Sequence, residues 1–421
     1  MMIDWIIGKK QPDDRQLFLW NMIGSGIYAL SSMVLTYLTI RVVGADDGGI
    51  YAIGLTLAQM FIYIAYYEMR NFEVTDAKDL YTFTDYHMVK LVNCFIMMIV
   101  SAGYVLLKNY DLNKALIIAL VCLYRMLDGY ADVYEAQFHK DGRLDLAGKS
   151  MAYRTIVSVG IYFAILIVTK DLIIALCGAV ISGIISLIIC DILVYKTLDK
   201  IRFEFNIKAM TGIWKDCFPL FVGMFLWTYL LSASRIAVDD VMTSEYQSYY
   251  QVLFMPVSVI NLFAGFLIRP SLIPLTDNLK NKEFGKFWKT IGKILLELTG
   301  ITVVCMLGAY LIGIPVLSII VGCELTQYRG LLTFLIFAGG FNAAAYTLYY
   351  VLTIYRDRIS IILGFGISSV IAFLISKPLT RSYELNGAAW SYCISVVVLT
   401  VIFVVSIIVN NKKKSFGEKQ A

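Results

Sequence analysis

Segment 115–138 is long enough to cross a membrane, yet it carries several charges. It holds Arg125, Asp128, Asp132 and Glu135 within an otherwise apolar run. At about 100° per residue, these four side chains fall on one stripe of a helix, roughly 80° wide. Charge inside a bilayer is costly and normally faces a bundle interior or a water-filled cavity. The segment therefore predicts a polar cavity within a membrane protein, and this favours a transporter.

The rest of the chain reads as a series of membrane helices. Of its 421 residues, 59% are hydrophobic and only 16% are charged, which excludes an ordinary soluble domain. Runs of about 18 or more apolar residues predict membrane spans. We expect an all-α polytopic membrane protein with twelve transmembrane helices, at residues 17–40, 50–67, 88–107, 115–138, 151–169, 172–194, 217–234, 246–268, 292–312, 330–352, 359–376 and 386–409.

Short connections and missing motifs exclude several functions. The connections leave no room for a soluble catalytic domain, and no Gly-x-x-x-x-Gly-Lys-Ser/Thr phosphate loop is present, so a P-loop pump in one chain is excluded. The eight cysteines are scattered without a Cys-x-x-Cys pair, and there are only two histidines. We therefore expect no metal site, no cofactor and no catalytic residues.

The distribution of positive charge predicts the orientation. When the N-terminus is placed in the cytoplasm, most of the 36 Lys and Arg residues lie on the cytoplasmic side, so both termini are expected there. We expect an amphipathic cytoplasmic segment at 1–16, two six-helix bundles at 17–200 and 201–410, and a basic cytoplasmic tail at 411–421.

A weak internal repeat supports the two bundles. Arg41, after the first span, is followed by the acidic pair 46–47, and Arg235, after the seventh span, is followed by the acidic pair 239–240. Six spans in each half preserve the orientation of a parallel duplication. Coincidence among common juxtamembrane residues is the alternative.

Arg125 lies inside the fourth span and has two interpretations. A guanidinium binds phosphate or carboxylate groups bidentately and stays charged, which suits an anionic group on a substrate. Alternatively, Asp128 at position i+3 neutralises it within the same helix. The sequence leaves both interpretations open.

The three carboxylates of the fourth span are candidates for ion coupling. Asp128, Asp132 and Glu135 outnumber Arg125, and acids crowded in a low-dielectric site exchange protons or bind Na⁺. Asp128 and Asp132 are close enough along the helix to share one proton or one ion. The alternative is a wet cytoplasmic vestibule in which the acids are merely solvated.

Further polar residues are weaker candidates for substrate binding. Arg41 and Arg235 lie at the predicted outer mouths of two spans, where they could bind an anion or reach lipid headgroups. Three amides inside spans could hydrogen-bond sugar hydroxyls or bridge helices, namely Gln59, Gln251 and Asn342. Arg154 and Arg269, at cytoplasmic ends of spans, are more typical of topology anchors.

Four stretches resemble a known family. They read RNFEVTDAK at 70–78, YTFTDY at 81–86, LYRMLDGYADVY at 123–134 and GRLDLAGK at 142–149. They are similar to the Wzx-type oligosaccharide flippases, the polysaccharide-biosynthesis branch of the MOP superfamily, which also contains the MATE and MurJ exporters. The resemblance covers most of the first half by motif and the whole chain by its twelve spans.

The resemblance implies a fold and a function. It implies two six-helix bundles around a central cavity, and a multi-pass protein of the bacterial inner (plasma) membrane that flips undecaprenyl-pyrophosphate-linked oligosaccharides for capsule, O-antigen or exopolysaccharide. Arg125 and Arg235 would hold the anionic head. Partners would be the lipid-linked oligosaccharide, membrane lipids, H⁺ or Na⁺, and the polymerase and glycosyltransferase machinery, without nucleic acid.

Two rival functions stay open at this point. A MATE-like cation-coupled multidrug antiporter would use the acids of the fourth span to bind a cationic substrate. A membrane-embedded polymerase or ligase would need large extracytoplasmic loops, which the predicted connections do not provide.

Overall fold

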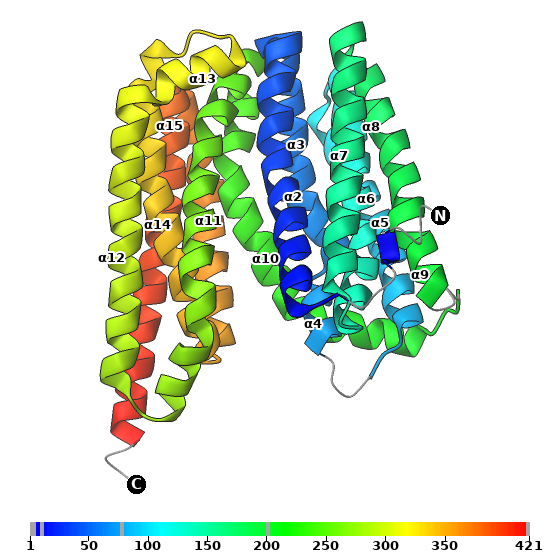
Figure 1. Cartoon of the computed structure of the whole chain (residues 1–421). Helices are drawn as coiled ribbons and strands as arrows, with labels where there is room; N and C mark the ends of the chain where they lie inside the picture. The colour runs from blue at the N-terminus through cyan, green and yellow to red at the C-terminus, as the bar shows by residue number, and fades with distance from the viewer. Residues whose placement is uncertain (1–5, 9–11, 76–79, 199–202, 418–421) are drawn as a thin grey trace. The chain divides into compact units, whose positions relative to one another are not determined.

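The computed structural model describes residues 6–8, 12–75, 80–198 and 203–417, and long helices dominate these ranges (Figure 1). Ten of the described segments are long and apolar enough to cross a membrane. The charged fourth span is not among the ten, although it forms helix α6 (Leu112–Lys140). The last of the ten, within α15 (Arg358–Gly417), contains two of the predicted spans, separated by non-helical backbone at Tyr383 and Glu384. The twelve predicted spans thus correspond to helices.

The chain divides into two compact units, Met1–Phe225 and Leu226–Ala421. The predicted boundary at residues 200 and 201 lies outside the described residues, and the observed division falls later, inside α10 (Ile207–Val241). The predicted segment at 1–16 and the tail at 411–421 are described only in part. Within that part, α15 continues through Gly417.

The first unit is built around α6. Helix α6 packs against four other long helices and the short α4, and is therefore the central helix of this unit. The central position explains why a helix with several charges is buried along most of its length. Besides α6 and the start of α10, the unit contains α2 (Asp14–Val43), α3 (Ala45–Tyr66), α4 (Met69–Thr75), α5 (Phe83–Lys108), α7 (Leu144–Thr169), α8 (Leu172–Leu187), the π-helical turn η1 (Ile188–Ile192) and α9 (Leu193–Leu198).

The second unit is built around α14 (Arg329–Ile354). This helix packs against α11, α12 and α15. The remaining elements of the unit, after the end of α10, are α11 (Ser244–Lys280), α12 (Phe284–Gly308), the π-helical turn η2 (Ala309–Gly313), α13 (Ile314–Val321), the 3₁₀ turn η3 (Thr326–Tyr328) and α15.

Local sequence signals fix where helices begin and end. Thr82 and Asp85 form a capping box at the start of α5, in which each side chain accepts from the backbone N–H of the other residue. Gly44, with φ of 88°, ends α2 and permits the sharp turn into α3. The capping box lies in the 81–86 stretch, so part of the family resemblance reflects a helix start.

Two glycines let α2 and α7 approach closely. A Cβ atom on Gly148 would lie 2.2 Å from the carbonyl oxygen of Trp20, and one on Gly24 would lie 2.3 Å from the carbonyl oxygen of Gly148. Such contacts are too short for any side chain, and small residues at membrane helix interfaces serve this purpose. Gly148 belongs to the 142–149 stretch, which therefore includes a packing requirement.

The 142–149 stretch also forms hydrogen bonds with the backbone of Ile6 and Ile7. Arg143 donates to the backbone oxygen of Ile7 at 2.7 Å, and Lys149 donates to that of Ile6 at 3.0 Å. Both side chains also form ion pairs with Asp145. Ile6 is buried in the hydrophobic core of the first unit.

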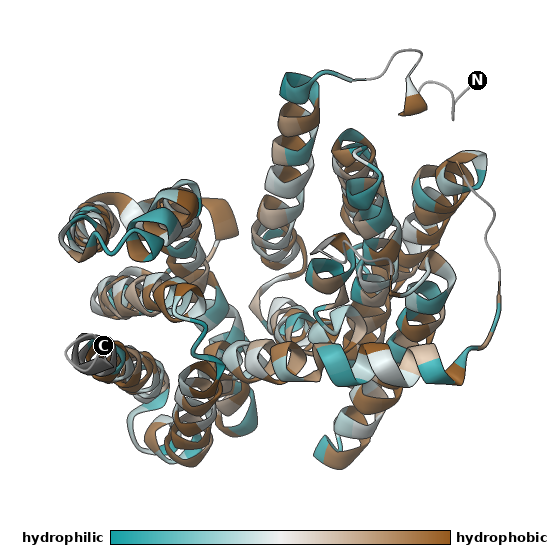
Figure 2. Ribbon diagram, turned by 90° about the horizontal axis from the view of Figure 1, so that it is seen from below, coloured by the Kyte–Doolittle hydropathy of each residue, from teal (hydrophilic) through white to brown (hydrophobic). Residues whose placement is uncertain are grey.

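Apolar side chains cover much of the outer surface. Figure 2 shows hydrophobic residues along the long helices of both units. Leu107 and Val168 are more than four-fifths exposed, and Ile319 and Leu296 are nearly three-quarters exposed. Exposed apolar surface of this extent would be unstable in water and fits contact with lipid tails.

Candidate functional site

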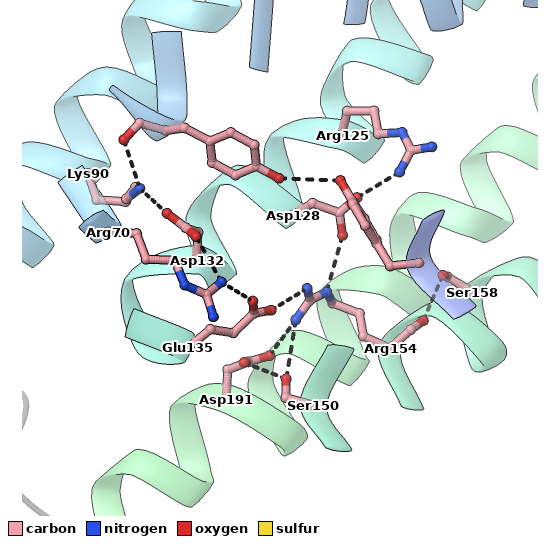
Figure 3. Close-up of polar contacts among 12 residues, drawn as sticks. Arg70, Lys90, Arg125, Asp128, Asp132, Glu135, Ser150, Arg154, Ser158 and Asp191 are labelled. Carbon is pink, nitrogen blue, oxygen red and sulfur yellow. Dashed lines mark hydrogen bonds and ion pairs between the residues drawn. The ribbon is translucent and has the colours of Figure 1, made fainter. Parts of the chain in front are cut away.

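The charged stripe of α6 faces the interior of the first unit, as the sequence predicts. Arg125, Asp128, Asp132 and Glu135 are all buried, and none is more than 7% exposed. Figure 3 shows their side chains converging with charged residues from other helices. We call this set of ion-paired side chains the buried ion network.

Arg154, on α7, is the hub of one half of the network. Its three guanidinium nitrogens donate to three carboxylates: Glu135 at 2.9 Å, Asp191 at 3.0 Å and Asp128 at 3.3 Å. Asp191 also accepts from Ser150, one turn before Arg154. One arginine thus joins α6, α7 and η1. The expectation that Arg154 is a topology anchor is wrong, because its side chain is buried among acids.

Lys90 and Arg70 neutralise the other half. Lys90, on α5, donates to Asp132 at 2.8 Å, and its side chain is 1% exposed. Arg70, on α4, donates to Asp132 at 3.3 Å and to Glu135 at 3.0 Å. Glu135 therefore lies between Arg70 and Arg154 and connects the two halves (Figure 3).

Arg125 forms the intrahelical pair with Asp128 that one of its two interpretations predicts, whereas binding of an anion stays a prediction. One terminal nitrogen donates to Asp128 at 3.1 Å, and the other donates to Ser32 of α2 at 2.6 Å. Its guanidinium also lies 5.5 Å from the centre of the Tyr28 ring, within cation–π distance. The Nε–H has no hydrogen-bond partner among the described residues. The intrahelical pair exists, and one donor is left for a further group.

Among the ion-paired side chains of the network, cations from other helices balance the acidic surplus of α6. The network contains four carboxylates, from Asp128, Asp132, Glu135 and Asp191. They face four cations, namely Arg70, Lys90, Arg125 and Arg154. Each carboxylate of α6 forms an ion pair with at least one cation, and coupling of these acids to H⁺ or Na⁺ stays a prediction. Burial of this many charges is tolerable because they are paired.

Three members of the network, Asp191, Lys90 and Arg70, were not predicted as site residues, and the sequence marks them to different degrees. Asp191 is the one charged residue in the apolar run 172–195, which marks it as an intramembrane acid. The π-helical turn η1 places it toward Arg154, and such turns are frequent at functional sites. Lys90 lies just inside its span. Arg70 has no comparable signal, because it follows a span in a polar connection.

Arg235 and Gln251 are brought together in the second unit. Both are buried, and Arg235 donates to the Gln251 side-chain oxygen at 3.5 Å and to Ser232 at 3.4 Å. Its guanidinium lies 4.8 Å from the centre of the Phe254 ring. Among the residues described, Arg235 makes no ion pair with a carboxylate, and its Nε–H is unsatisfied. It is an interior cation, not a residue at an exposed helix mouth.

The other predicted substrate-binding residues lie apart. Asn342 is buried in α14 and donates to the Asn261 side chain at 3.0 Å, which is a bridge between helices. Gln59 is half-buried in α3, and Arg41 is exposed in the last turn of α2. In the described part of the chain, no group of three or more His, Cys, Asp and Glu residues lies close enough to hold a metal ion.

Comparison with known proteins gives one curated relative and several structural neighbours. A capsular polysaccharide biosynthesis protein, CapF of Staphylococcus aureus, is 24% identical over 391 residues, covering 90% of this chain and 95% of that protein. The lipid II flippase MurJ in an inward closed conformation superimposes with a TM-score of 0.70 at 14% identity, covering 92% of this chain and 87% of MurJ. The MATE multidrug transporter DinF-BH gives 0.64 at 13% identity, covering 94% of each chain. No family model matches the sequence.

These likenesses define the class of protein. The fold is like that of MurJ and of the MATE transporters of the MOP superfamily, which confirms the predicted all-α polytopic membrane fold. Its helices are long and apolar enough to cross a membrane, and the fold matches those of membrane transporters, so the chain is a multi-pass membrane protein. The relative from Staphylococcus aureus is itself a capsular polysaccharide biosynthesis protein.

Proposed function

We propose that this protein is a flippase that moves lipid-linked oligosaccharide repeat units across the bacterial inner membrane by alternating access. Two findings support the proposal: the fold is that of the MOP-superfamily transporters, and a relative along nearly the whole chain is a capsular polysaccharide biosynthesis protein. The observation that carries it is Arg125, a buried arginine in a membrane span with an unused N–H donor.

The ion network suggests how an anionic headgroup is bound. Asp128 forms ion pairs with both Arg125 and Arg154. When a phosphate replaces Asp128 as the partner of Arg125, Asp128 therefore stays paired with Arg154. Binding then exchanges one ion pair for another without leaving a buried charge unpaired, which would cost several kcal/mol. We infer that a pyrophosphate group on an undecaprenyl carrier fits this exchange, because guanidinium groups bind phosphates bidentately.

The alternative is a MATE-like multidrug antiporter. A cationic drug would need a carboxylate in the interior, and all three carboxylates of α6 already contact protein cations. An incoming cation would have to displace a lysine or arginine and leave it unpaired. The pairing therefore favours an anionic substrate.

Reconstituted protein tests the proposal directly. Proteoliposomes carrying undecaprenyl-pyrophosphate-linked oligosaccharide on one leaflet are assayed for arrival of the sugar at the other, detected by a lectin that cannot enter. We expect Arg125→Ala to abolish transport, and Arg125→Lys to restore only part of it, because the bidentate geometry is lost. Arg381→Ala, which changes an exposed arginine of α15, is the control.

Two results would contradict the proposal. Wild-type transport by Arg125→Ala would remove Arg125 from the mechanism. Absence of lipid-linked sugar transport, together with efflux of ethidium by cells that produce the protein, would establish the antiporter instead.

A further inference from the structure

A second polar site lies in the second unit, away from Arg235. A pocket of about 360 Å³ is lined by residues from several separate elements of this unit. Tyr246 belongs to the start of α11, Gln327 and Tyr328 to η3, and Glu384 and Asn386 to the kink within α15. The volume lies in the range of small-ligand sites, which is roughly 300–1,000 Å³.

The position of the pocket follows from the helix ends. Helices α11 and α14, and the last part of α15 after the kink, all begin beside it, and α15 then runs away from it to the C-terminal end of the chain. The predicted orientation places the C-terminus in the cytoplasm. The pocket therefore lies at the extracytoplasmic end of the second unit.

The lining combines aromatic rings with groups that bind hydroxyls. The Tyr249 ring lies between those of Tyr246 and Tyr328, at centroid distances of 6.2 Å and 5.7 Å, and keeps the two lining tyrosines in place. Gln327 and Asn386 each offer donors and an acceptor, and Glu384 offers two acceptor oxygens. A sugar presents donor and acceptor hydroxyls on a ring with apolar faces, and this lining matches that pattern.

The charge of the lining argues against a phosphate ligand. None of the lining residues that the structure describes is Lys or Arg, and Glu384 is an acid. An anionic headgroup would be repelled, whereas a neutral polyol would not. This separates the pocket chemically from the interior arginines.

Glu384 is held in an unfavourable backbone conformation. Its φ of 53° and ψ of −136° place a non-glycine residue in a region that side chains rarely adopt. Outliers of this kind persist where the surrounding structure enforces them, and they cluster at functional sites. A glycine would fit this backbone better but would lack the carboxylate.

We propose that this pocket is a carbohydrate-binding subsite for a neutral pyranose. Stacking on Tyr246 or Tyr328 would bind the ring, and Glu384 with Asn386 would accept from and donate to its hydroxyls. Its role as a receiving site for a sugar of the exported oligosaccharide rests on the proposed function. Sugar binding itself does not.

Saturation-transfer NMR on the full-length, detergent-solubilised protein tests the subsite. The probes are the methyl glycosides of glucose and galactose, and N-acetylglucosamine, at millimolar concentration. We expect transfer to at least one sugar, and about tenfold weaker binding in Glu384→Gln, the size expected for losing a hydrogen bond to a charged group. Tyr328→Ala and Asn386→Ala should also weaken it. The matched control is Glu324→Gln, an exposed acid in the connection just before η3.

The outcomes separate the two proposals. Transfer that is equal in wild type and all pocket variants, or absent for every sugar, overturns the subsite. Displacement of the sugar by inorganic pyrophosphate also overturns it, because the pocket should not bind anions. Sugar binding that depends on Glu384 supports the subsite even when lipid-linked transport fails. Transport without such binding leaves the flippase proposal intact and removes the subsite.

Discussion

Arg154, on α7, neutralises carboxylates from two other elements, α6 and η1. Each nitrogen of its planar guanidinium pairs with a different carboxylate. The ammonium of a lysine cannot reproduce this geometry. Removing it leaves Asp128 with Arg125 and Glu135 with Arg70, but Asp191 loses its only ion pair among the described residues. The cost of the loss is therefore concentrated at Asp191.

We predict that Arg154→Met destabilises the protein by about 3–5 kcal/mol, the cost of breaking a buried ion pair from one side. Arg154→Lys should lose less, and Arg154→Met combined with Asp191→Asn should recover part of the loss. The measurement is the midpoint of thermal unfolding of the detergent-solubilised protein, followed by tryptophan fluorescence.

Arg15→Met, an exposed change in the first turn of α2, provides the comparison, and it should shift the midpoint little. An Arg154→Met protein as stable as Arg15→Met would show that the buried ion network does not hold the first unit together.

At the scale of helices, the contact between α2 and α7 depends on the absence of side chains. Gly148 and Gly160 lie on the same helix but meet different surroundings. A Cβ on Gly148 would collide with the backbone of Trp20, whereas a Cβ on Gly160 would meet nothing within 4 Å. Comparing alanine substitutions at Gly148 and Gly160 therefore separates the effect of helix packing from the effect of helix propensity.

We predict opposite effects of the two alanine substitutions. Gly148→Ala should destabilise the protein by about 1–3 kcal/mol, because α2 must move away from α7. Gly160→Ala should stabilise it by about 0.5–1 kcal/mol through the lower flexibility of alanine. Thermal unfolding of both variants gives the comparison. A stabilising Gly148→Ala would mean that the helices do not cross as closely as described.

The sequence could predict properties that belong to one segment, but not contacts between segments. The spans were predictable because length and hydropathy are properties of one segment, and the inward stripe of α6 because a helix has a fixed period. The partners of that stripe were not predictable, because Arg70, Lys90 and Arg154 meet it only after α4, α5 and α7 have packed on α6. Arg154 resembled a topology anchor for the same reason, since its surroundings come from other elements.

At the scale of the whole chain, the two units differ in how they treat buried charge. The first pairs four cations with four carboxylates, whereas the second buries Arg235 with amides and hydroxyls. The acidic pairs that suggested a duplication also differ, because residues 46–47 lie in the first turn of α3 and residues 239–240 lie near the end of α10. The equivalence of Arg41 and Arg235 stays a prediction, which superposition of the two halves can test.

The proposed coupling to H⁺ or Na⁺ requires a carboxylate whose partner changes during transport. Asp132 is a suitable candidate, because it joins Lys90 on α5 to Arg70 on α4. Asp132→Asn alone gives an ambiguous result, since it also leaves the buried ammonium of Lys90 without its carboxylate. Replacing both members of the pair separates coupling from charge balance.

We predict that Asp132→Asn lowers the unfolding midpoint and that Asp132→Asn with Lys90→Met regains part of the loss, because the double variant removes both members of the buried ion pair. Both variants should bind substrate, but their transport in proteoliposomes should no longer respond to an imposed H⁺ or Na⁺ gradient. Lys90→Met alone controls for the lost ammonium. If the double variant is stable and its transport still follows the gradient, Asp132 serves only to neutralise Lys90, and the coupling ion must act at another group.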